Sequence, residues 1–137
     1  MILQTKKNGR SFFIALMAYL LLIFVLSHVP GQTWQKLDLN LWDKLVHFFE
    51  YMPVGVLLAA WLLSGYLKEL KTGFSILILF ALIVVAGVGD ELHQHFVPGR
   101  QTAFGDVIAD TLGGSVGVIC TVLILKWRRS EQRIDHG

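Results

Sequence analysis

The sequence predicts an all-α, polytopic membrane protein with four transmembrane helices and both termini in the cytoplasm. Charged residues occupy only 16% of the 137 positions, whereas a soluble domain contains about 25%, and the mean hydropathy is +0.58. Long apolar runs are the second observation, and the distribution of lysine and arginine is the third. The runs lack the alternation of polar and apolar residues that a membrane β-barrel strand requires, so we expect helices.

Four segments are long enough to span a bilayer, whose core of about 30 Å takes roughly 20 helical residues. They are 12–26 (extended to 11–29), 45–63, 73–89 (extended by 88–92) and 107–125. The second contains His47, Glu50 and Pro53, the third has no charge, and the fourth contains Asp110. A basic stretch before the first segment resembles the start of a signal peptide, but SHVPGQTW follows without a small-x-small cleavage pattern. We therefore expect an uncleaved first helix.

Basic residues predict the orientation. Most of the 12 lysines and arginines lie on one side: Lys6, Lys7, Arg10, Lys68, Lys71, Lys126, Arg128, Arg129 and Arg133. Lys36, Lys44 and Arg100 lie on the other. The positive-inside rule then places both termini in the cytoplasm. Because these flanks account for the net charge of +2, the charge does not indicate a nucleic-acid partner.

Acidic residues show the opposite distribution. Those expected in the outer loops or the outer halves of the spans are Asp38, Asp43, Glu50, Asp90, Glu91, Asp106 and Asp110, whereas Glu69, Glu131 and Asp135 lie on the inner side. Exposing an acid to lipid at the centre of the membrane costs about 2.5–3.5 kcal/mol. The outer acids should therefore face one another or a wet cavity, and we expect the chemistry of the protein on the outer side.

Helical spacing groups these polar residues. Asp43, His47, Glu50 and Tyr51 stand at i, i+4, i+7 and i+8 on one helix face, and Asp106 and Asp110 stand at i and i+4. If the segment GDELHQHF is helical, Asp90 shares a face with Gln94, and Glu91 with His95. The Gly113-x-x-x-Gly117 pattern would let another helix pack closely against the fourth span, and Pro53 and Gly55 permit a bend or a close approach in the second.

From this grouping we take His47, Glu91 and Asp106 as candidate catalytic residues. Candidate substrate-binding residues are Asp43, Lys44, Glu50, Tyr51, Asp90, Gln94, Arg100 and Asp110. Simpler interpretations stay open: Asp43 and Asp106 suit the first turn of a helix, and His47 can be a hydrogen-bonded packing histidine. Arg100 is either a surface residue or a counter-ion to Glu91 or Asp106, and Cys120 is expected to serve packing inside the fourth span.

Three motifs resemble signatures of the VanZ-like family of small bacterial membrane proteins. The first is Asp43, Lys44, His47, Phe48 and Tyr51; the second is Asp90, Glu91, Gln94, Phe96, Pro98 and Arg100; the third is Asp106, Thr111, Leu112, Gly113 and Gly117. One position departs from the family pattern, which usually has asparagine where this chain has Asp110. That departure adds an ionisable group within the span.

The resemblance implies a multi-pass protein of the bacterial cytoplasmic membrane. We expect one domain over residues 1–137, with the motifs in 43–117 and a cytoplasmic tail from 127 to 137. The family takes its name from a protein associated with low-level resistance to the glycopeptide teicoplanin. A role in the cell envelope and an effect on glycopeptide susceptibility are therefore expected.

Three functions are compatible with the sequence. The first is an accessory or binding protein whose outward-facing polar pocket engages a lipid-linked cell-wall component or an envelope protein, alone or as an oligomer. The second is a membrane-embedded enzyme that uses acid/base chemistry on a lipid-linked substrate; with no serine nucleophile elbow or Cys–His pair in the sequence, hydrolysis would use water. The third is a conduit for protons or cations. No cofactor is evident, although His and carboxylate ligands admit a divalent cation.

Overall fold

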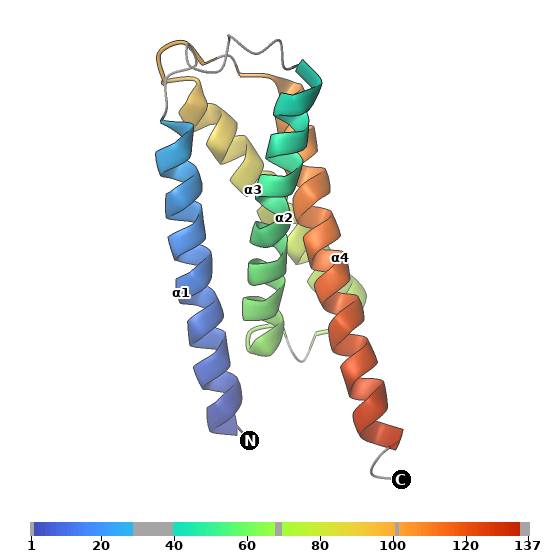
Figure 1. Ribbon diagram of the computed structural model, residues 1–137. Coiled ribbons are helices and arrows are strands. Elements are labelled where there is room, and N and C mark those ends of the chain that lie inside the picture. Colours follow the sequence, from blue (N-terminus) through green and yellow to red (C-terminus); the bar gives the residue numbers. More distant parts are fainter. Residues whose placement is uncertain (1, 29–39, 68–69, 101, 135–137) are drawn as a thin grey trace.

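The computed structural model describes residues 2–28, 40–67, 70–100 and 102–134, and within these ranges it forms four helices. They are α1 (Ile2–Ser27), α2 (Asn40–Ser64), α3 (Thr72–Gln94) and α4 (Phe104–Ile134). All four are long and apolar enough to cross a membrane. α1 and α3 run away from the end of the bundle that carries both termini, and α2 and α4 run back toward it (Figure 1). The predicted all-α architecture with four spans is confirmed.

The helices extend beyond the predicted spans: α1 and α2 begin earlier, at Ile2 and Asn40, and α3 and α4 end later. α3 continues five residues beyond the uncharged run and ends at Gln94, so that Asp90 and Glu91 lie within the helix. α4 continues to Ile134, well past the predicted end of the span at Leu125. Both helices can continue through charged residues because a helix satisfies its own backbone hydrogen-bonding groups whether or not its side chains face lipid.

α2 and α4 form the closest helix–helix contact of the bundle, and glycine residues allow it because they have no side chain to separate the backbones. A Cβ atom at Gly113 would collide with the backbone carbonyl oxygen of Phe48, and one at Gly117 with that of Met52. From the other helix, a Cβ at Gly55 would collide with the carbonyl of Gly114. The two backbones therefore touch, as the Gly-x-x-x-Gly pattern predicts.

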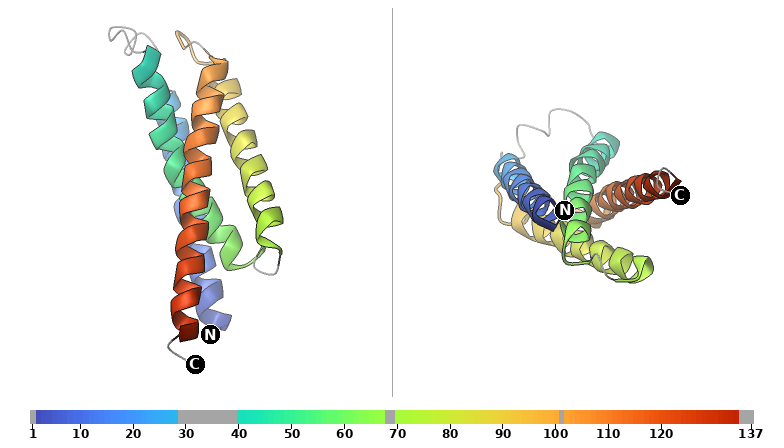
Figure 2. Two further views of the ribbon diagram at one scale, coloured as in Figure 1. Left: turned by 90° about the vertical axis from the view of Figure 1, so that its right-hand side faces the viewer. Right: turned by 90° about the horizontal axis from the view of Figure 1, so that it is seen from below.

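α1 and α3 complete the bundle around this pair. α1 packs along α2, and α3 crosses behind α2 at a slant, with its C-terminal end near α1 (Figures 1 and 2). The buried core contains apolar side chains from every helix: Leu16, Ile23, Val54, Ala59, Leu79, Ile83, Val118 and Val122. Large apolar side chains also cover the outside, as expected for a surface in contact with lipid.

Cys120 departs from the prediction that it packs inside the fourth span. Its side chain is exposed on the outside of α4. The reason is that α4 is apolar around most of its circumference at this level, so residue type alone does not distinguish the core face from the lipid face.

Candidate functional site

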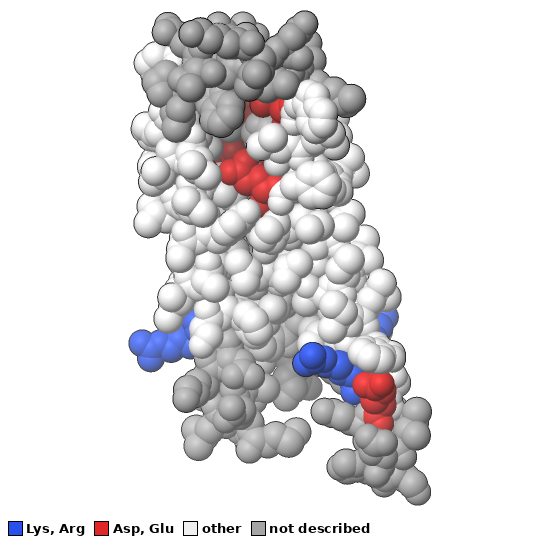
Figure 3. Space-filling view, viewed as in Figure 1, with Lys and Arg blue, Asp and Glu red and all other residues white. Residues whose placement is uncertain are grey.

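Charged side chains separate toward the two ends of the bundle. Figure 3 shows acidic side chains in a recess of the surface between α1 and α2, far from the termini, and lysine and arginine side chains near the opposite end. We call the acidic region, which contains Asp43, His47, Glu91, Asp106 and Asp110, the polar half of the bundle. The predicted segregation of charge along the membrane normal is therefore present in the fold.

His47 is at the centre of the polar half. Its ring is buried, and its Nδ1 atom lies 3.0 Å from Oδ1 of Asp110, which is fully buried on α4. The helical spacing of α2 places His47 on the face toward α4, and the glycine contact three residues beyond Asp110 brings the two helices close enough for this hydrogen bond. The hydrogen bond orients the imidazole, as it would in a catalytic histidine and in a hydrogen-bonded packing histidine alike.

Asp106 lies one turn above Asp110 and makes the second link between α4 and α2. Its Oδ1 accepts a hydrogen bond of 3.1 Å from Nζ of Lys44. The lysine side chain is 40% exposed, whereas the aspartate is 3% exposed. Both Asp43 and Asp106 occupy first turns of their helices, where a negative charge is stabilised by the helix dipole. Asp106 therefore both stabilises the start of α4 and links α4 to α2 through its ion pair with Lys44.

Glu91 enters the polar half from α3. The residue is buried, and Oε2 accepts a hydrogen bond of 3.1 Å from the backbone N–H of Ala103, in the segment leading into α4. The other oxygen, Oε1, is buried without a hydrogen-bond partner among the described residues, as is Oδ2 of Asp110. Each carboxylate thus has one hydrogen-bonded oxygen and one oxygen without a partner among the described residues.

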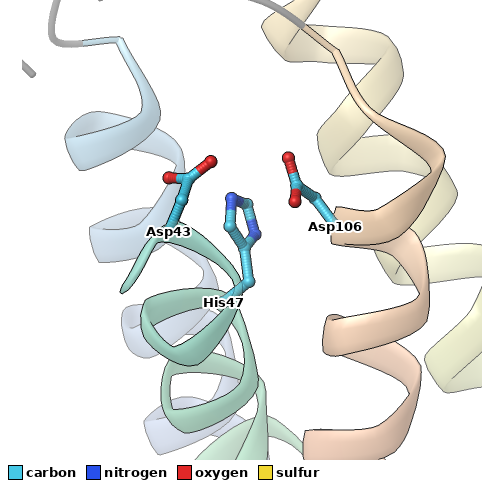
Figure 4. A group of neighbouring side chains, drawn as sticks. All are labelled: Asp43, His47 and Asp106. Atoms are coloured by element: carbon cyan, nitrogen blue, oxygen red, sulfur yellow. The ribbon is translucent and has the colours of Figure 1, made fainter. Parts of the chain in front are cut away.

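Two overlapping groups of side chains share His47. Asp43 and Asp106 lie on either side of its ring, one from α2 and one from α4 (Figure 4). Glu91 and Asp110 form the second group with it. In each group one nitrogen or oxygen atom per residue lies within 4.8 Å of the others. The three candidate catalytic residues, His47, Glu91 and Asp106, therefore belong to one contiguous cluster.

Asp90 and Gln94 lie on the α1 side of the polar half. Nε2 of Gln94 donates to Oδ2 of Asp90 at 2.9 Å, which confirms that the two share a helix face. Oγ of Ser27, at the end of α1, donates to Oδ1 of the same aspartate at 3.2 Å. The second predicted pair keeps its helical spacing, since the backbone N–H of His95, the C-cap of α3, donates to the carbonyl oxygen of Glu91. The two side chains differ in burial: Glu91 is buried and His95 is exposed.

The remaining candidates lie at the edges of the cluster. Tyr51 is buried, and its hydroxyl donates to the carbonyl oxygen of Ala86 on α3. Glu50 is partly buried, and its backbone carbonyl accepts from the hydroxyl of Tyr19 on α1. Both hydroxyls tie neighbouring helices to the polar half.

Arg100 is not the counter-ion of Glu91 or Asp106. Among the described residues the ion pairs are Lys44 with Asp106 and His47 with Asp110, while Nε of Arg100 is buried without a hydrogen-bond partner. The turn that carries it requires Gly99, whose φ of 77° is in the left-handed region. The expectation for the binding role of Arg100 stays a prediction.

Two α1 residues, Ser27 and Tyr19, were not predicted to contribute to the site. Ser27 is buried at the level of Asp90. The sequence offered one signal for Ser27: it is a polar residue at the end of an apolar run, on the same side as the acidic helix ends. That signal is weak, because hydroxyl residues occur at the ends of spans for many reasons.

Comparison with known proteins gives one match. The family model described as VanZ/LLP1 matches residues 5–125, which cover most of α1, all of α2 and α3, and α4 as far as Leu125. No curated protein and no solved structure matches the chain significantly.

Proposed function

The chain belongs to the VanZ/LLP1 family, and from that premise we propose that it is an accessory membrane protein of the bacterial cell envelope. In this proposal both termini are cytoplasmic, and the polar half faces the outer leaflet of the cytoplasmic membrane. There it binds the polar part of a lipid-linked cell-wall component and alters susceptibility to teicoplanin-type glycopeptides.

The observation that carries the proposal is the convergence of polar side chains from all four helices in one half of the bundle. α1 contributes Ser27, α2 contributes His47, α3 contributes Glu91, and α4 contributes Asp106 and Asp110. Figure 3 shows acidic side chains in a recess at the end of the bundle far from the termini, which the proposed orientation assigns to the outer leaflet. Such a surface favours hydroxyl, amide or amine donors over a bare phosphate, because most of its charges are negative.

The charge pattern supports the proposed orientation. The described basic side chains near the termini, Arg10, Lys126 and Arg128, are exposed at the end opposite the polar half. The positive-inside rule assigns that end to the cytoplasm, which leaves the polar half on the outer side.

A binding and susceptibility assay tests the proposal. The full chain, reconstituted in nanodiscs, is titrated with a labelled lipid-linked cell-wall precursor, and teicoplanin susceptibility is measured in cells that express it. Asp106→Asn should weaken binding about tenfold, or about 1.4 kcal/mol, because a charge-assisted contact is lost. Glu131→Gln is the matched control, since Glu131 is exposed at the other end of the bundle. Equal behaviour of both variants and the wild type in both assays would remove the proposal.

A second function, acid/base catalysis on a lipid-linked substrate, is supported by the oriented His47 ring. Asp110 holds Nδ1, and the carboxylates of Glu91 and Asp106 lie on the two sides of the same cluster. Such a group could activate water. Turnover of a labelled precursor that falls about 10²–10⁴-fold in His47→Asn would favour the enzyme, whereas binding without turnover by the wild type favours the accessory protein.

The conduit is the least supported of the three functions. In the half of the bundle near the termini, the buried polar side chains described are Ser75 and Thr121. The hydroxyl of Ser75 donates to the backbone carbonyls of Leu67 and Lys71, and that of Thr121 to the carbonyl of Gly117. Leu58, Leu62 and Val122 fill the core around them. A proton or cation crossing this half of the monomer would meet apolar packing.

A further inference from the structure

Three helices each direct one buried ionisable side chain to a common point. His47 of α2, Glu91 of α3 and Asp110 of α4 are 3%, 6% and 0% exposed. One nitrogen or oxygen atom of each lies within 4.8 Å of the other two. Such convergence of a histidine and two carboxylates inside a helix bundle is the arrangement by which bundles hold metal ions.

The two carboxylates have free oxygens at this point. Oε2 of Glu91 is held by the N–H of Ala103, and Oδ1 of Asp110 is held by His47. Oε1 of Glu91 and Oδ2 of Asp110 are buried and have no hydrogen-bond partner among the described residues. Buried polar atoms without a partner are rare, because they lose hydration and gain nothing in return, so these two oxygens are available to a ligand from outside the described residues.

Charge indicates what that ligand is. A histidine that ligates a metal is neutral, and in that state the two carboxylates leave two negative charges uncompensated. Within the described part of the chain, the lysine paired nearby, Lys44, already neutralises Asp106. One divalent cation balances the pair without any further residue. A buried uncompensated charge is costly in a membrane interior, so a cation would stabilise the helices that hold it.

The distances suit a metal ion. Ligands on opposite sides of a metal with bonds of about 2.1–2.4 Å lie roughly 4.2–4.8 Å apart, so three atoms that all lie within 4.8 Å of one another can reach one ion. Adjacent ligands at right angles are about 3.0 Å apart for bonds of about 2.1 Å, which equals the separation of Nδ1 and Oδ1. A metal ion can take the place of the proton between His47 and Asp110 once the ring and the carboxylate turn to direct both atoms at the ion.

We propose that His47, Glu91 and Asp110 bind one divalent transition-metal ion, of the Zn²⁺ or Mn²⁺ class, between α2, α3 and α4. The mixed nitrogen and oxygen ligand set suits these ions better than Mg²⁺ or Ca²⁺, which prefer oxygen ligands alone. The overlapping group of Asp43, His47 and Asp106 is the weaker site, because the lysine already occupies Asp106. The site needs no lipid ligand and stands independently of the proposed function.

Metal binding to the purified full chain tests the site. The protein is stripped with EDTA in detergent and dialysed against Zn²⁺, Mn²⁺ or Mg²⁺, after which bound metal per chain and the thermal unfolding midpoint are measured. The variants are Glu91→Gln, which conserves shape, and Asp110→Asn, which introduces the residue usual in the family pattern and is expected to fold. Asp90→Asn is the matched control, since it neutralises the neighbouring acid on α3 outside the site, and Asp106→Asn tests the overlapping group.

The expected result is one Zn²⁺ or Mn²⁺ per wild-type chain, a higher unfolding midpoint with metal, and little binding of Mg²⁺. Glu91→Gln and Asp110→Asn should each lower the affinity at least about tenfold, since even residues behind metal ligands affect it by that factor, and Asp90→Asn should not. A wild type that binds no metal would overturn the proposal. So would full binding by Asp110→Asn, or a loss confined to Asp106→Asn. Lipid binding is measured separately, so either proposal can fail alone.

Discussion

His47 on α2 and Asp110 on α4 share a buried hydrogen bond of 3.0 Å, although 63 positions separate them in sequence. The bond lies inside a membrane-spanning bundle, where neither group can exchange its partner for water. Both the stability of the bundle and the orientation of the imidazole therefore depend on this pair.

Removing the acceptor should destabilise the protein strongly. Asp110→Ala leaves a buried His47 without its partner, so we expect a loss of about 3–5 kcal/mol in the free energy of unfolding. Asp110→Asn retains a side-chain oxygen that can accept from Nδ1 and should cost clearly less. Reversible unfolding of the purified variants in mixed micelles measures both. Equal losses would show that the charge of Asp110, and not its hydrogen bond, matters to the fold.

The glycine contact between α2 and α4 predicts an unusual response to alanine. Gly113→Ala places a methyl group against the carbonyl of Phe48, and we expect a loss of about 1–3 kcal/mol from overpacking. Gly89→Ala on α3 meets nothing within 4 Å and should stabilise its helix by up to about 1 kcal/mol. The same unfolding measurement compares the two, and a neutral Gly113→Ala would contradict the close approach of the helices.

Lys44 and Asp106 should show energetic coupling. In a double-mutant cycle of Lys44→Met, Asp106→Asn and the combined variant, we expect a coupling free energy of about 0.5–3 kcal/mol. The value should lie toward the lower end, because water reaches the lysine, which is 40% exposed. Arg100→Gln combined with Asp106→Asn forms the control cycle. Coupling to Arg100 that exceeds coupling to Lys44 would contradict the observed pairing.

Labelling of single cysteines tests the proposed orientation. In a Cys120→Ala background, Thr102→Cys lies between α3 and α4 and Lys71→Cys between α2 and α3, and both positions are exposed. A maleimide that cannot cross membranes should label Thr102→Cys in intact cells and Lys71→Cys only after permeabilisation. The reverse pattern would place the polar half in the cytoplasm and remove the proposed function.

Periodicity and charge predicted much of this architecture, because each acts through a simple constraint. Apolar length fixes which segments span a bilayer, and the i, i+4 spacing of Asp106 and Asp110 fixes their common face. The glycine pattern likewise predicted the close α2–α4 contact, since little else lets two backbones touch.

Other features depend on geometry that the pattern does not contain. Lys44 pairs with Asp106 in place of Arg100 because α2 lies directly against α4 at that level. Glu91 is fixed by a backbone N–H of Ala103, which any residue type could have supplied. Ser27 reaches Asp90 only because α3 slants toward the end of α1. The exposure of Cys120 could not be predicted either, since lipid and the protein core accept the same apolar side chains.

The carbonyl contacts of Gly113 and Gly117 have a mechanical consequence. A separation between two helix axes that is set by main-chain atoms cannot be tuned by changing rotamers, so α2 and α4 behave as one stiff unit. Hydroxyl groups of Tyr19 and Ser27 hold α1 to the rest of the polar half, and such side-chain contacts are easily exchanged. Any rearrangement of the bundle should therefore move α1 or α3 relative to this pair before it separates α2 from α4.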